Sequence, residues 1–441
     1  MKEWEFKRTP IFFTIRLSER SVNSKKRDIF IRLRSFDISN KGVYGLSRTV
    51  ILDGARTPFG KFGGALSSLS ASDLGSIAIQ EALKKSAVKA DQVGEVIIGT
   101  VLQAGQGQIP SRQAASKAGI PMSVKTETIN KVCASGMRSV TLADQIIRLG
   151  DEEIIVAGGM ESMSNAPYYM PKGRFGLRMG DASLVDGMIF DGLSCAFHPK
   201  QVHMGVYGND TAQKFNITRE QQDAWAVRSH EKALSAIEAG KFVEEIVPVE
   251  IPQRKGEPVR VVQDEAPRAG TSLETLAKLK SAFSSDGTIT AGNAPGVNDG
   301  ACALVLMNEE RAKKENRPTL ATILAHVEVG VAPEDFPQTP GLVINALLEK
   351  TGKTLDDIDL IEINEAFAAV ALVSNQISGL DEAKVNVNGG AVALGHPIGA
   401  SGARIILTLA YELKRRGGGL GIAAICSGGG QGDAVLIEVT N

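Results

Sequence analysis

A chain of 441 residues can bury more than one hydrophobic core, and two or three domains are expected. Its content of 43% hydrophobic and 22% charged residues is typical of a soluble globular protein and excludes a disordered or fibrous one. No apolar run approaches the roughly 18–20 residues of a membrane span, and four cysteines in a chain of this length are not a disulfide framework. No Cys or His spacing is typical of a zinc site, so we expect reduced thiols and no metal.

The N-terminal residues differ in charge from the rest of the chain. Residues 1–48 contain twelve Lys/Arg and five Asp/Glu, although the whole chain has a net charge of −1. The apolar run 11–15 is too short for the core of a secretory signal, and the five acids argue against an organelle transit peptide. We expect residues 1–47 to be a basic tail outside the fold of a cytoplasmic protein, with organelle import as the alternative. Nothing later in the chain indicates a basic nucleic-acid surface.

From about Ser47 onward, short apolar strands alternate with helical patterns. Strands are predicted at 48–53, 94–99, 127–132 and 153–159, and helices at 72–86, 110–118 and 137–149. Between 160 and 290 the alternation weakens; helices are expected at 208–215, 218–239 and 272–280, and a strand at 247–249. It then returns, with strands at 301–307, 320–329, 358–363, 385–388, 420–426 and 433–439 and helices at 340–351, 364–376 and 400–415. This pattern predicts an α/β fold whose mixed or parallel sheet is covered on both faces.

The two alternating regions contain similar segments at a nearly constant spacing. The segment 82–98 matches 346–362 at an offset of 264 residues, and Ala-Ser-Gly at 134–136 recurs at 400–402. Each Ala-Ser-Gly opens a predicted helix, which leads to a strand that ends in glycines. We therefore expect two duplicated α/β units about a pseudo-two-fold axis, with the helix N-termini converging on one site.

Cys133 is the first candidate for chemistry, because it lies between a predicted strand and a predicted helix. Unpaired backbone N–H groups and the helix dipole favour a thiolate at such a junction, so we interpret Cys133 as a nucleophile. A cysteine in this position, taken alone, is more often a small buried residue.

Three further blocks change that balance. They are Asn364-Glu365-Ala366-Phe367, the glycine-rich stretch 386–402 that contains His396, and the stretch 425–432 in which Cys426 precedes three glycines. A lone His-Pro is more often a turn, and a lone Asn is more often a helix cap. Two cysteines and a histidine at equivalent places in two repeated units instead indicate a reactive site.

Together these motifs resemble the thiolase family, of the acetyl-CoA acetyltransferase or 3-ketoacyl-CoA thiolase type. The resemblance extends from about residue 48 to 438, and the matching segments are 130–137, 158–164, 203–205, 291–294, 364–367, 395–402 and 426–432. It implies a thiolase-like fold of two α/β units in α-β-α-β-α layers with an inserted loop-rich domain. We expect the first half at 48–165, completed by about 298–318, the insertion over CoA at 166–297, and the second half at 319–441.

The resemblance also implies a reaction, the reversible condensation of two acetyl-CoA into acetoacetyl-CoA and CoA. In the family scheme, His396 activates Cys133, which is acylated by the first acetyl-CoA. Cys426 then removes an α-proton from the second, while His396 and a water on Asn364 hold the enolate oxygen. The backbone N–H groups of Cys133 and Gly428 form a second oxyanion hole. No cofactor is expected, since the CoA thioester is the substrate.

CoA is expected to contact the insertion and the strand-end loops. The residues that match the family's CoA-binding positions are His203, Met204, Arg268, Phe283, Ala291, Gly292, Ala366 and Phe367. For Arg268, a solvated loop charge is the alternative. The family motif Gly-Asn-Ala-Ser-Gly reads Gly-Asn-Ala-Pro-Gly here, so the hydroxyl that would face pantetheine is missing at Pro295.

Three other functions are possible for a chain with these motifs. A 3-ketoacyl-CoA thiolase for longer chains is the nearest, but Phe336 in the loop 330–336 favours short acyl groups. A non-catalytic acyl-CoA-binding protein is expected to lack one of the three reactive residues, and a decarboxylating ketoacyl synthase pairs its cysteine with two histidines. The stretch 163–170 resembles the start of the segment that assembles thiolase tetramers, so a homodimer or homotetramer is expected. Cys195 and Cys302 are interpreted as structural.

Overall fold

The computed structural model describes residues 47–440. The basic tail predicted for residues 1–47 lies outside this part of the chain, apart from Ser47. Among the helices described, none combines the length and the apolar character that crossing a membrane requires.

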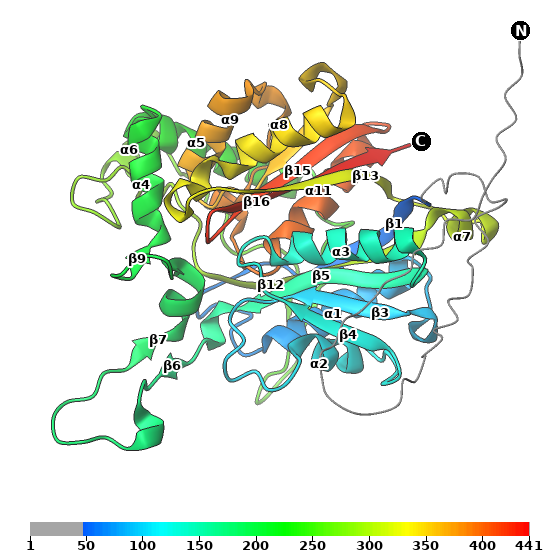
Figure 1. Cartoon of the computed structure of the whole chain (residues 1–441), viewed down its shortest axis with the longest axis horizontal. Coiled ribbons are helices and arrows are strands. Elements are labelled where there is room, and N and C mark those ends of the chain that lie inside the picture. Colours follow the sequence, from blue (N-terminus) through cyan, green and yellow to red (C-terminus); the bar gives the residue numbers. More distant parts are fainter. Residues whose placement is uncertain (1–46, 441) are drawn as a thin grey trace, which may run out of the picture. The chain divides into compact units, whose positions relative to one another are not determined.

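The first half is built on five strands in the order β4-β3-β5-β12-β1 (Figure 1). They are β1 (Thr49–Arg56), β3 (Glu95–Gly99), β4 (Lys125–Ile129), β5 (Ile154–Ser162) and β12 (Asn298–Asn308). β3 pairs in parallel with β4 and β5, and β12 pairs antiparallel with β5 and β1. A two-residue strand β2 (Gly60–Lys61) adds to β12. Helices α1 (Ala71–Lys85), α2 (Pro110–Lys117) and α3 (Ser135–Leu149) accompany this sheet, and α7 (Glu309–Lys314) follows β12.

The second half repeats this topology. Its strands are β13 (Ala321–Gly330), β14 (Leu360–Ile363), β15 (Gly419–Ser427) and β16 (Gln431–Val439), and its main helices are α8 (Thr339–Thr351), α9 (Ala368–Ser378) and α11 (Ser401–Arg415). β14 pairs in parallel with β15, while β16 pairs antiparallel with β15 and β13. Antiparallel pairing of β1 with β13 joins the halves into one sheet. The prediction of two duplicated α/β units is thereby confirmed.

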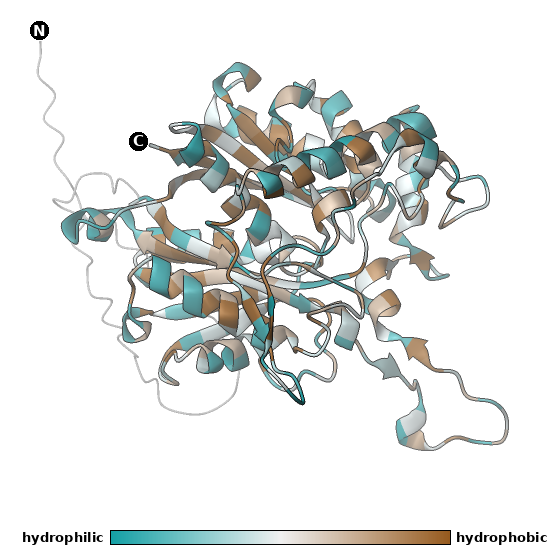
Figure 2. Cartoon of the chain, turned by 180° about the vertical axis from the view of Figure 1, so that it is seen from behind, coloured by the Kyte–Doolittle hydropathy of each residue, from teal (hydrophilic) through white to brown (hydrophobic). Residues whose placement is uncertain are grey.

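Five layers follow from which side chains share a core. α1 and α2 pack on one face of the first half's strands, and α8 and α9 pack on one face of the second half's strands. Between them, α3 and α11 share a core with strands of both halves. Hydrophobic residues concentrate in the central strands, whereas the outer helices are largely hydrophilic on their exposed sides (Figure 2). The order is therefore α-β-α-β-α.

Two predicted strand ends are wrong, each for a local reason. The strand predicted at 127–132 ends at Ile129, because the chain turns before Val132, whose φ of 45° is left-handed. The strand predicted at 385–388 shrinks to one parallel bridge between Val385 and Ile361. Beyond that bridge the side-chain amide of Asn386 replaces backbone pairing with β14. It accepts from the Ile363 N–H at 2.8 Å and donates to the Ile363 carbonyl at 2.9 Å.

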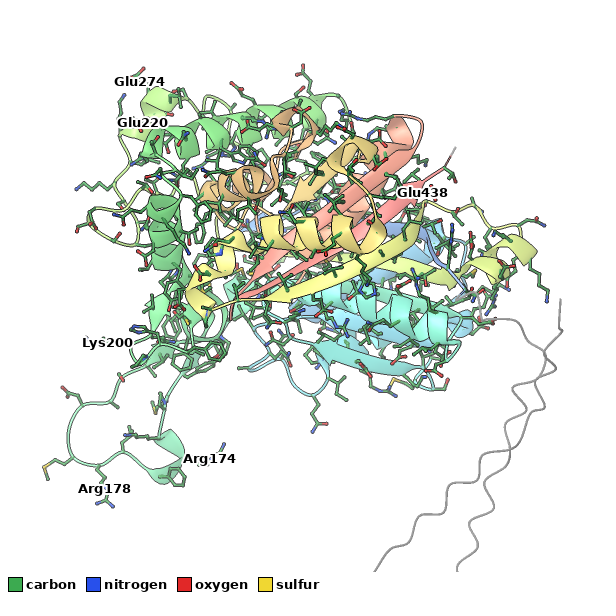
Figure 3. All side chains as sticks on the ribbon, turned by 45° about the horizontal axis from the view of Figure 1, so that its top comes forward. Arg174, Arg178, Lys200, Glu220, Glu274 and Glu438 are labelled. Carbon is green, nitrogen blue, oxygen red and sulfur yellow. The ribbon has the colours of Figure 1, made fainter. Side chains whose placement is uncertain are left out.

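The segment between β5 and β12, inserted within the first half, is irregular, as predicted. It contains β6 (Tyr168–Tyr169), β7 (Val185–Asp186), β8 (Ser194–Cys195), β9 (Val202–His203), α4 (Met204–Lys214), α5 (Arg219–Glu238), β10 (Val249–Ile251), β11 (Val259–Val261) and α6 (Leu273–Ala277). The loop between β6 and β7 extends away from the layers, with Arg174 and Arg178 near its tip (Figure 3). The domain boundaries at 165 and 297 remain predictions.

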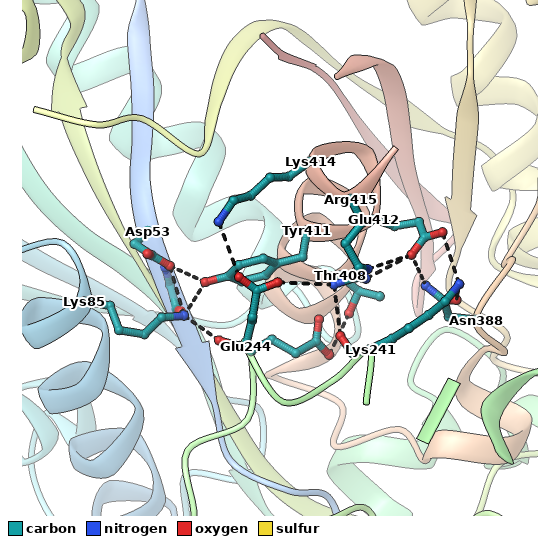
Figure 4. A network of polar contacts seen from close by, with 12 residues as sticks. Asp53, Lys85, Lys241, Glu244, Asn388, Thr408, Tyr411, Glu412, Lys414 and Arg415 are labelled. Carbon is teal, nitrogen blue, oxygen red and sulfur yellow. Dashed lines mark hydrogen bonds and ion pairs between the residues drawn. The ribbon is translucent and has the colours of Figure 1, made fainter. Parts of the chain in front are cut away.

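Helix α11 is buried over most of its length, because it lies in the middle layer. Its polar side chains therefore need internal partners, which they find in a network that reaches both halves (Figure 4). Tyr411 donates to an Asp53 carboxylate oxygen at 2.5 Å, and Lys85 pairs with the same carboxylate at 3.0 Å. Glu412 accepts from the Asn388 amide at 2.9 Å and pairs with Lys241 at 3.3 Å.

The repeated Ala-Ser-Gly segments explain how α3 and α11 approach each other. A Cβ on Gly402 would lie 2.4 Å from the Met137 nitrogen, and one on Gly136 would lie 2.7 Å from the Gly399 oxygen. Both neighbours are backbone atoms, so they cannot move aside as a flexible side chain could. The two helix N-termini can meet only because both positions are glycine.

Gly402→Ala should therefore lower the free energy of unfolding by about 1–3 kcal/mol, because the new methyl overpacks the helix contact. Urea unfolding curves of the purified protein would measure this change. Gly330→Ala is the matched control, since a Cβ there meets nothing within 4 Å. Equal stability of the two variants would contradict the role assigned to the helix contact.

Candidate active site

Cys133 lies in a tight turn between β4 and α3. Val132 is left-handed, and Ser135 Oγ both donates to the Val132 carbonyl at 2.6 Å and accepts from the Lys131 N–H at 2.8 Å. α3 begins at Ser135, so the Cys133 thiol lies next to the N-terminus of the helix. The small residues that follow Cys133 permit this turn and the close approach of α11.

His396 lies on the loop before α11, and its ring is held from both sides. Ser401 Oγ lies 2.6 Å from Nδ1 and donates its own proton to the Pro397 carbonyl at 2.9 Å. The hydroxyl oxygen therefore accepts the Nδ1 proton, which leaves the lone pair on Nε2. Asn364 Nδ2 lies 3.4 Å from Nε2, and the His396 N–H donates to Asn298 Oδ1 at 2.9 Å.

The protonation states at the site are set mainly by burial. Burial, with the Arg404 charge as a smaller cause, lowers the pKa of His396 to about 3, so its imidazole is neutral at physiological pH. Burial raises the pKa of the Cys133 thiol to about 12, and hydrogen bonds from the Gly428 and Cys133 N–H groups only partly oppose this. The resting site thus contains a thiol and a neutral base. We expected the helix N-terminus to favour a thiolate, but its effect is outweighed by desolvation.

Cys426 and Gly428 approach Cys133 from the second half. Cys426, at the end of β15, is fully buried, and its pKa is raised well above its usual value by burial and by the neighbouring Cys133 sulfur. The Gly428 N–H lies near the Cys133 sulfur and lowers its pKa, so the nitrogen that the sequence predicted for the second oxyanion hole is close to Cys133. Cys426 and Asn364 are fully buried, and neither lines the cavity that contains Cys133 and His396.

An apolar cavity of about 250 Å³ lies beside the turn that carries Cys133. Its wall includes the reactive Cys133, His396 and Gly428, and five predicted CoA-binding residues: His203, Met204, Phe283, Ala366 and Phe367. The His203 and Phe283 rings stack at 4.4 Å between centroids. Pro295 and Phe336 also line this cavity.

A second cavity of about 390 Å³ shares Gly296 and Val297 with the first. Arg268 and Ala291, the predicted contacts nearer the nucleotide, line this second cavity with Lys61. Gly292 lines neither cavity. Its N–H bonds to Thr290 Oγ1 at 3.1 Å, and a Cβ there would lie 2.5 Å from the Leu276 side chain. Its smallness is therefore needed for packing.

Two buried carboxylates shape the site and were not identified from the sequence. Glu161 accepts from Thr100 Oγ1 at 3.2 Å and from the N–H groups of Val101, Leu102 and Gly399 at 2.9–3.1 Å. It thus ties the loop after β3 to the loop that carries His396, and burial raises its pKa to about 7. Glu161 lies in a family-like segment, but nothing local marks it as a bridge.

Glu365 has the corresponding role for the inserted segment. It accepts from Trp225 Nε1 at 2.8 Å and Ser229 Oγ at 2.9 Å on α5, and from the Asn386 amide at 2.9 Å and the Val392 N–H at 3.0 Å. α5 is therefore fastened to the second half beside Ala366 and Phe367. Within residues 47–440, including this site, no group of three or more His, Cys, Asp or Glu side chains is placed to hold a metal.

Comparison with known proteins gives consistent matches over the chain. A family model described as the thiolase N-terminal domain matches residues 49–310, and one described as the thiolase C-terminal domain matches residues 317–439. The acetyl-CoA acetyltransferase of Pseudomonas aeruginosa is 51% identical over 388 residues, covering 88% of this chain and 98% of that protein. That of Cupriavidus necator is 51% identical over 393 residues, covering 89% and 100%. The crystal structure of the Bacillus anthracis acetyl-CoA acetyltransferase superimposes with a TM-score of 0.87 at 44% identity, covering 89% of this chain and 99% of that one.

The neutral state of His396 predicts a pH dependence of stability. Because the folded pKa is about 3 and the unfolded one about 6.5, the unfolded chain binds a proton that the folded chain does not between these values. The free energy of unfolding should therefore decrease as the pH is lowered below about 6.5. His396 contributes up to about 1.4 kcal/mol to this decrease for each pH unit. Between pH 6 and 4, His396→Gln should show a shallower fall in urea titrations. Above pH 7 the two curves should run parallel; equal slopes throughout would contradict a buried neutral His396.

Proposed function

The chain is a member of the thiolase family, and from this premise we propose that it is an acetyl-CoA C-acetyltransferase. It would condense two acetyl-CoA into acetoacetyl-CoA and CoA, reversibly and by a ping-pong route through acetyl-Cys133. The observation that carries the proposal is that Cys133, Gly428 and the neutral imidazole of His396 line one cavity. The CoA thioester is the substrate, and the scheme uses no further cofactor.

The first half-reaction begins from a thiol and a neutral imidazole. As the Cys133 sulfur attacks the thioester carbon, its proton moves to His396 Nε2, and the developing oxyanion is held by backbone N–H groups. The carbon–sulfur bond to CoA then breaks, and the CoA thiolate takes a proton from Cys426. Cys133 is now acetylated, while Cys426 is a thiolate beside an imidazolium.

The second half-reaction uses this charge pair. The Cys426 thiolate removes an α-proton from a second acetyl-CoA, and the imidazolium of His396, with a water on Asn364, holds the enolate oxygen. The enolate carbon attacks acetyl-Cys133, and the carbon–sulfur bond to Cys133 breaks. Cys133 regains its proton from His396, so both thiols and the neutral imidazole are restored. Two thiols of high pKa suit this scheme, because each carries its proton at rest and gives it up only during the reaction.

The acyl group is proposed to be short. Phe336 is 3% exposed and lines the reactive cavity, so its ring limits the space beside Cys133. The similar proteins from P. aeruginosa and C. necator carry the name acetyl-CoA acetyltransferase, which supports the same assignment. A longer-chain 3-ketoacyl-CoA thiolase is therefore the less favoured alternative.

We also propose a homodimer or homotetramer in the cytoplasm. Phe175 is 89% and Phe197 is 73% exposed in the inserted segment, and large apolar side chains of this kind are commonly covered by a second chain. Light scattering of the purified protein would give the mass of the assembly; a monomer at all concentrations would contradict this proposal.

Removing each sulfur should have a different effect. Cys133→Ala should abolish covalent acetylation by acetyl-CoA, as followed by intact mass, because no nucleophile remains. Cys426→Ser should still become acetylated, although more slowly because a serine hydroxyl is a weaker acid toward the leaving CoA thiolate. It should lose condensation by about 100–10,000-fold, because the base for the α-proton is replaced by a much weaker acid–base group. Cys302→Ala, a buried thiol away from the cavity, is the control that should retain both activities. Acetylation of Cys133→Ala at the wild-type rate would show that the nucleophile is misassigned.

The substrate assignment has a direct test. CoA-dependent cleavage of acetoacetyl-CoA should proceed with a kcat/KM at least about tenfold above that for ketoacyl-CoA substrates of eight or more carbons, since one or more kcal/mol of steric cost gives such a ratio. Both can be measured by the loss of ketoacyl-CoA absorbance. A preference for the long chains would favour the 3-ketoacyl-CoA thiolase instead.

A further inference from the structure

Lys131 lies two residues before Cys133 and binds the opposite half of the molecule. Its side chain is only 12% exposed, and Nζ lies 2.8 Å from an Asp433 carboxylate oxygen and 2.5 Å from a Glu328 carboxylate oxygen. Lys131 lines neither CoA cavity. It is thus close to the nucleophile in sequence while remaining outside the substrate's path.

The two carboxylates need such a cation. Glu328 on β13 and Asp433 on β16 are direct cross-strand partners, and like charges in that relation repel each other. The Asp433 side chain is 1% exposed, and burial raises its pKa to about 6 while Lys131 opposes the shift. Both cations come from the first half, since Arg138 on α3 pairs with Glu328 at 3.0 Å. The ion cluster therefore joins the turn before Cys133 to the strand that follows Gly428.

The turn before Cys133 also meets the end of β15 in two other places. Ser427 Oγ donates to the Lys131 carbonyl at 2.5 Å, and the next residue, Gly428, lines the same cavity as Cys133. Between these contacts lies Val132, a β-branched residue held at a φ of 45°. A left-handed, β-branched residue is strained and persists only where its surroundings hold it in place. The ion pair of Lys131 supplies part of that constraint.

We propose that Lys131 is a positioning residue for acyl transfer, which holds the turn at Val132 so that the Cys133 sulfur keeps its place in the cavity beside Gly428 and His396. The ammonium acts through Asp433 and Glu328 and does not touch the reacting atoms. The inference rests on the proposed function, because it concerns the acylation of Cys133. Without the ion pair the turn is free to relax, and the sulfur loses its fixed direction of attack.

The test measures the rate of Cys133 acetylation in four variants by rapid-quench intact mass. Lys131→Met should acetylate about 10–100-fold more slowly, the cost typical of a reacting group misplaced by about 1 Å. The dissociation constant for CoA should stay within about twofold, since Lys131 is outside both cavities. Lys131→Arg keeps the charge and should recover most of the rate.

Two variants separate positioning from folding. Lys131→Met/Asp433→Asn avoids leaving the buried carboxylate unpaired, so it should fold even where the single variant does not, and it should still acetylate slowly. Arg148→Met removes another cation of α3, which pairs with Asp144 at 2.8 Å and donates to the Ile323 carbonyl at 2.8 Å, at the far end of the helix. It should lose stability but acetylate at the wild-type rate.

The outcomes are distinct. Wild-type acetylation by the folded double variant, or an equal loss of rate in Arg148→Met, overturns the positioning role of Lys131. Failure of the wild-type protein to acetylate would count against the proposed function and not against Lys131. In that case, alkylation of Cys133 by iodoacetamide serves as the readout, and equal rates in wild type and the double variant overturn the inference.

Discussion

The contact between α3 and α11 is the constraint on which the site depends. The helices belong to different halves, yet their first turns touch backbone to backbone at Gly136 and Gly402. Cys133 immediately precedes one helix, and His396 lies on the loop that leads into the other. Any side chain at either glycine would separate the helix ends and, with them, Cys133 and His396. Duplication of the α/β unit thus yields a site between the copies, with each copy contributing different chemistry at an equivalent place.

The chemistry of the site is governed by desolvation more than by dipoles. A helix N-terminus favours a thiolate by about 0.3–1 kcal/mol in ordinary cases, which is small against the cost of burying an unpaired charge. The site therefore rests with all its reactive groups neutral, and charge appears only as protons move during turnover. In the proposed scheme, fixed backbone N–H groups such as that of Gly428 stabilise this charge as it forms.

Much of this organisation could be predicted from the sequence, and the exceptions have physical reasons. Sequence patterning predicted α3, α5, α8 and α11 within two residues at each end, because long segments give the clearest helical pattern. It failed at Val132 and Asn386, where a left-handed residue and a side-chain amide end a strand that composition would extend. It also missed the bridging roles of Glu161 and Glu365. Their partners are separated from them by up to 238 and 140 residues, and only the folded chain brings them together.

Strand β12 has a consequence for the order in which the chain can fold. It is buried between β5 and β1, so the first sheet lacks a central strand until this segment arrives. During synthesis, β5 is complete at Ser162, but β12 ends only at Asn308. Until β12 is synthesised, the edges of β5 and β1 that pair with it are exposed, and exposed strand edges are prone to mispairing. The inserted segment that contributes to the substrate cavity therefore also delays completion of the first half's sheet, because it is synthesised between β5 and β12.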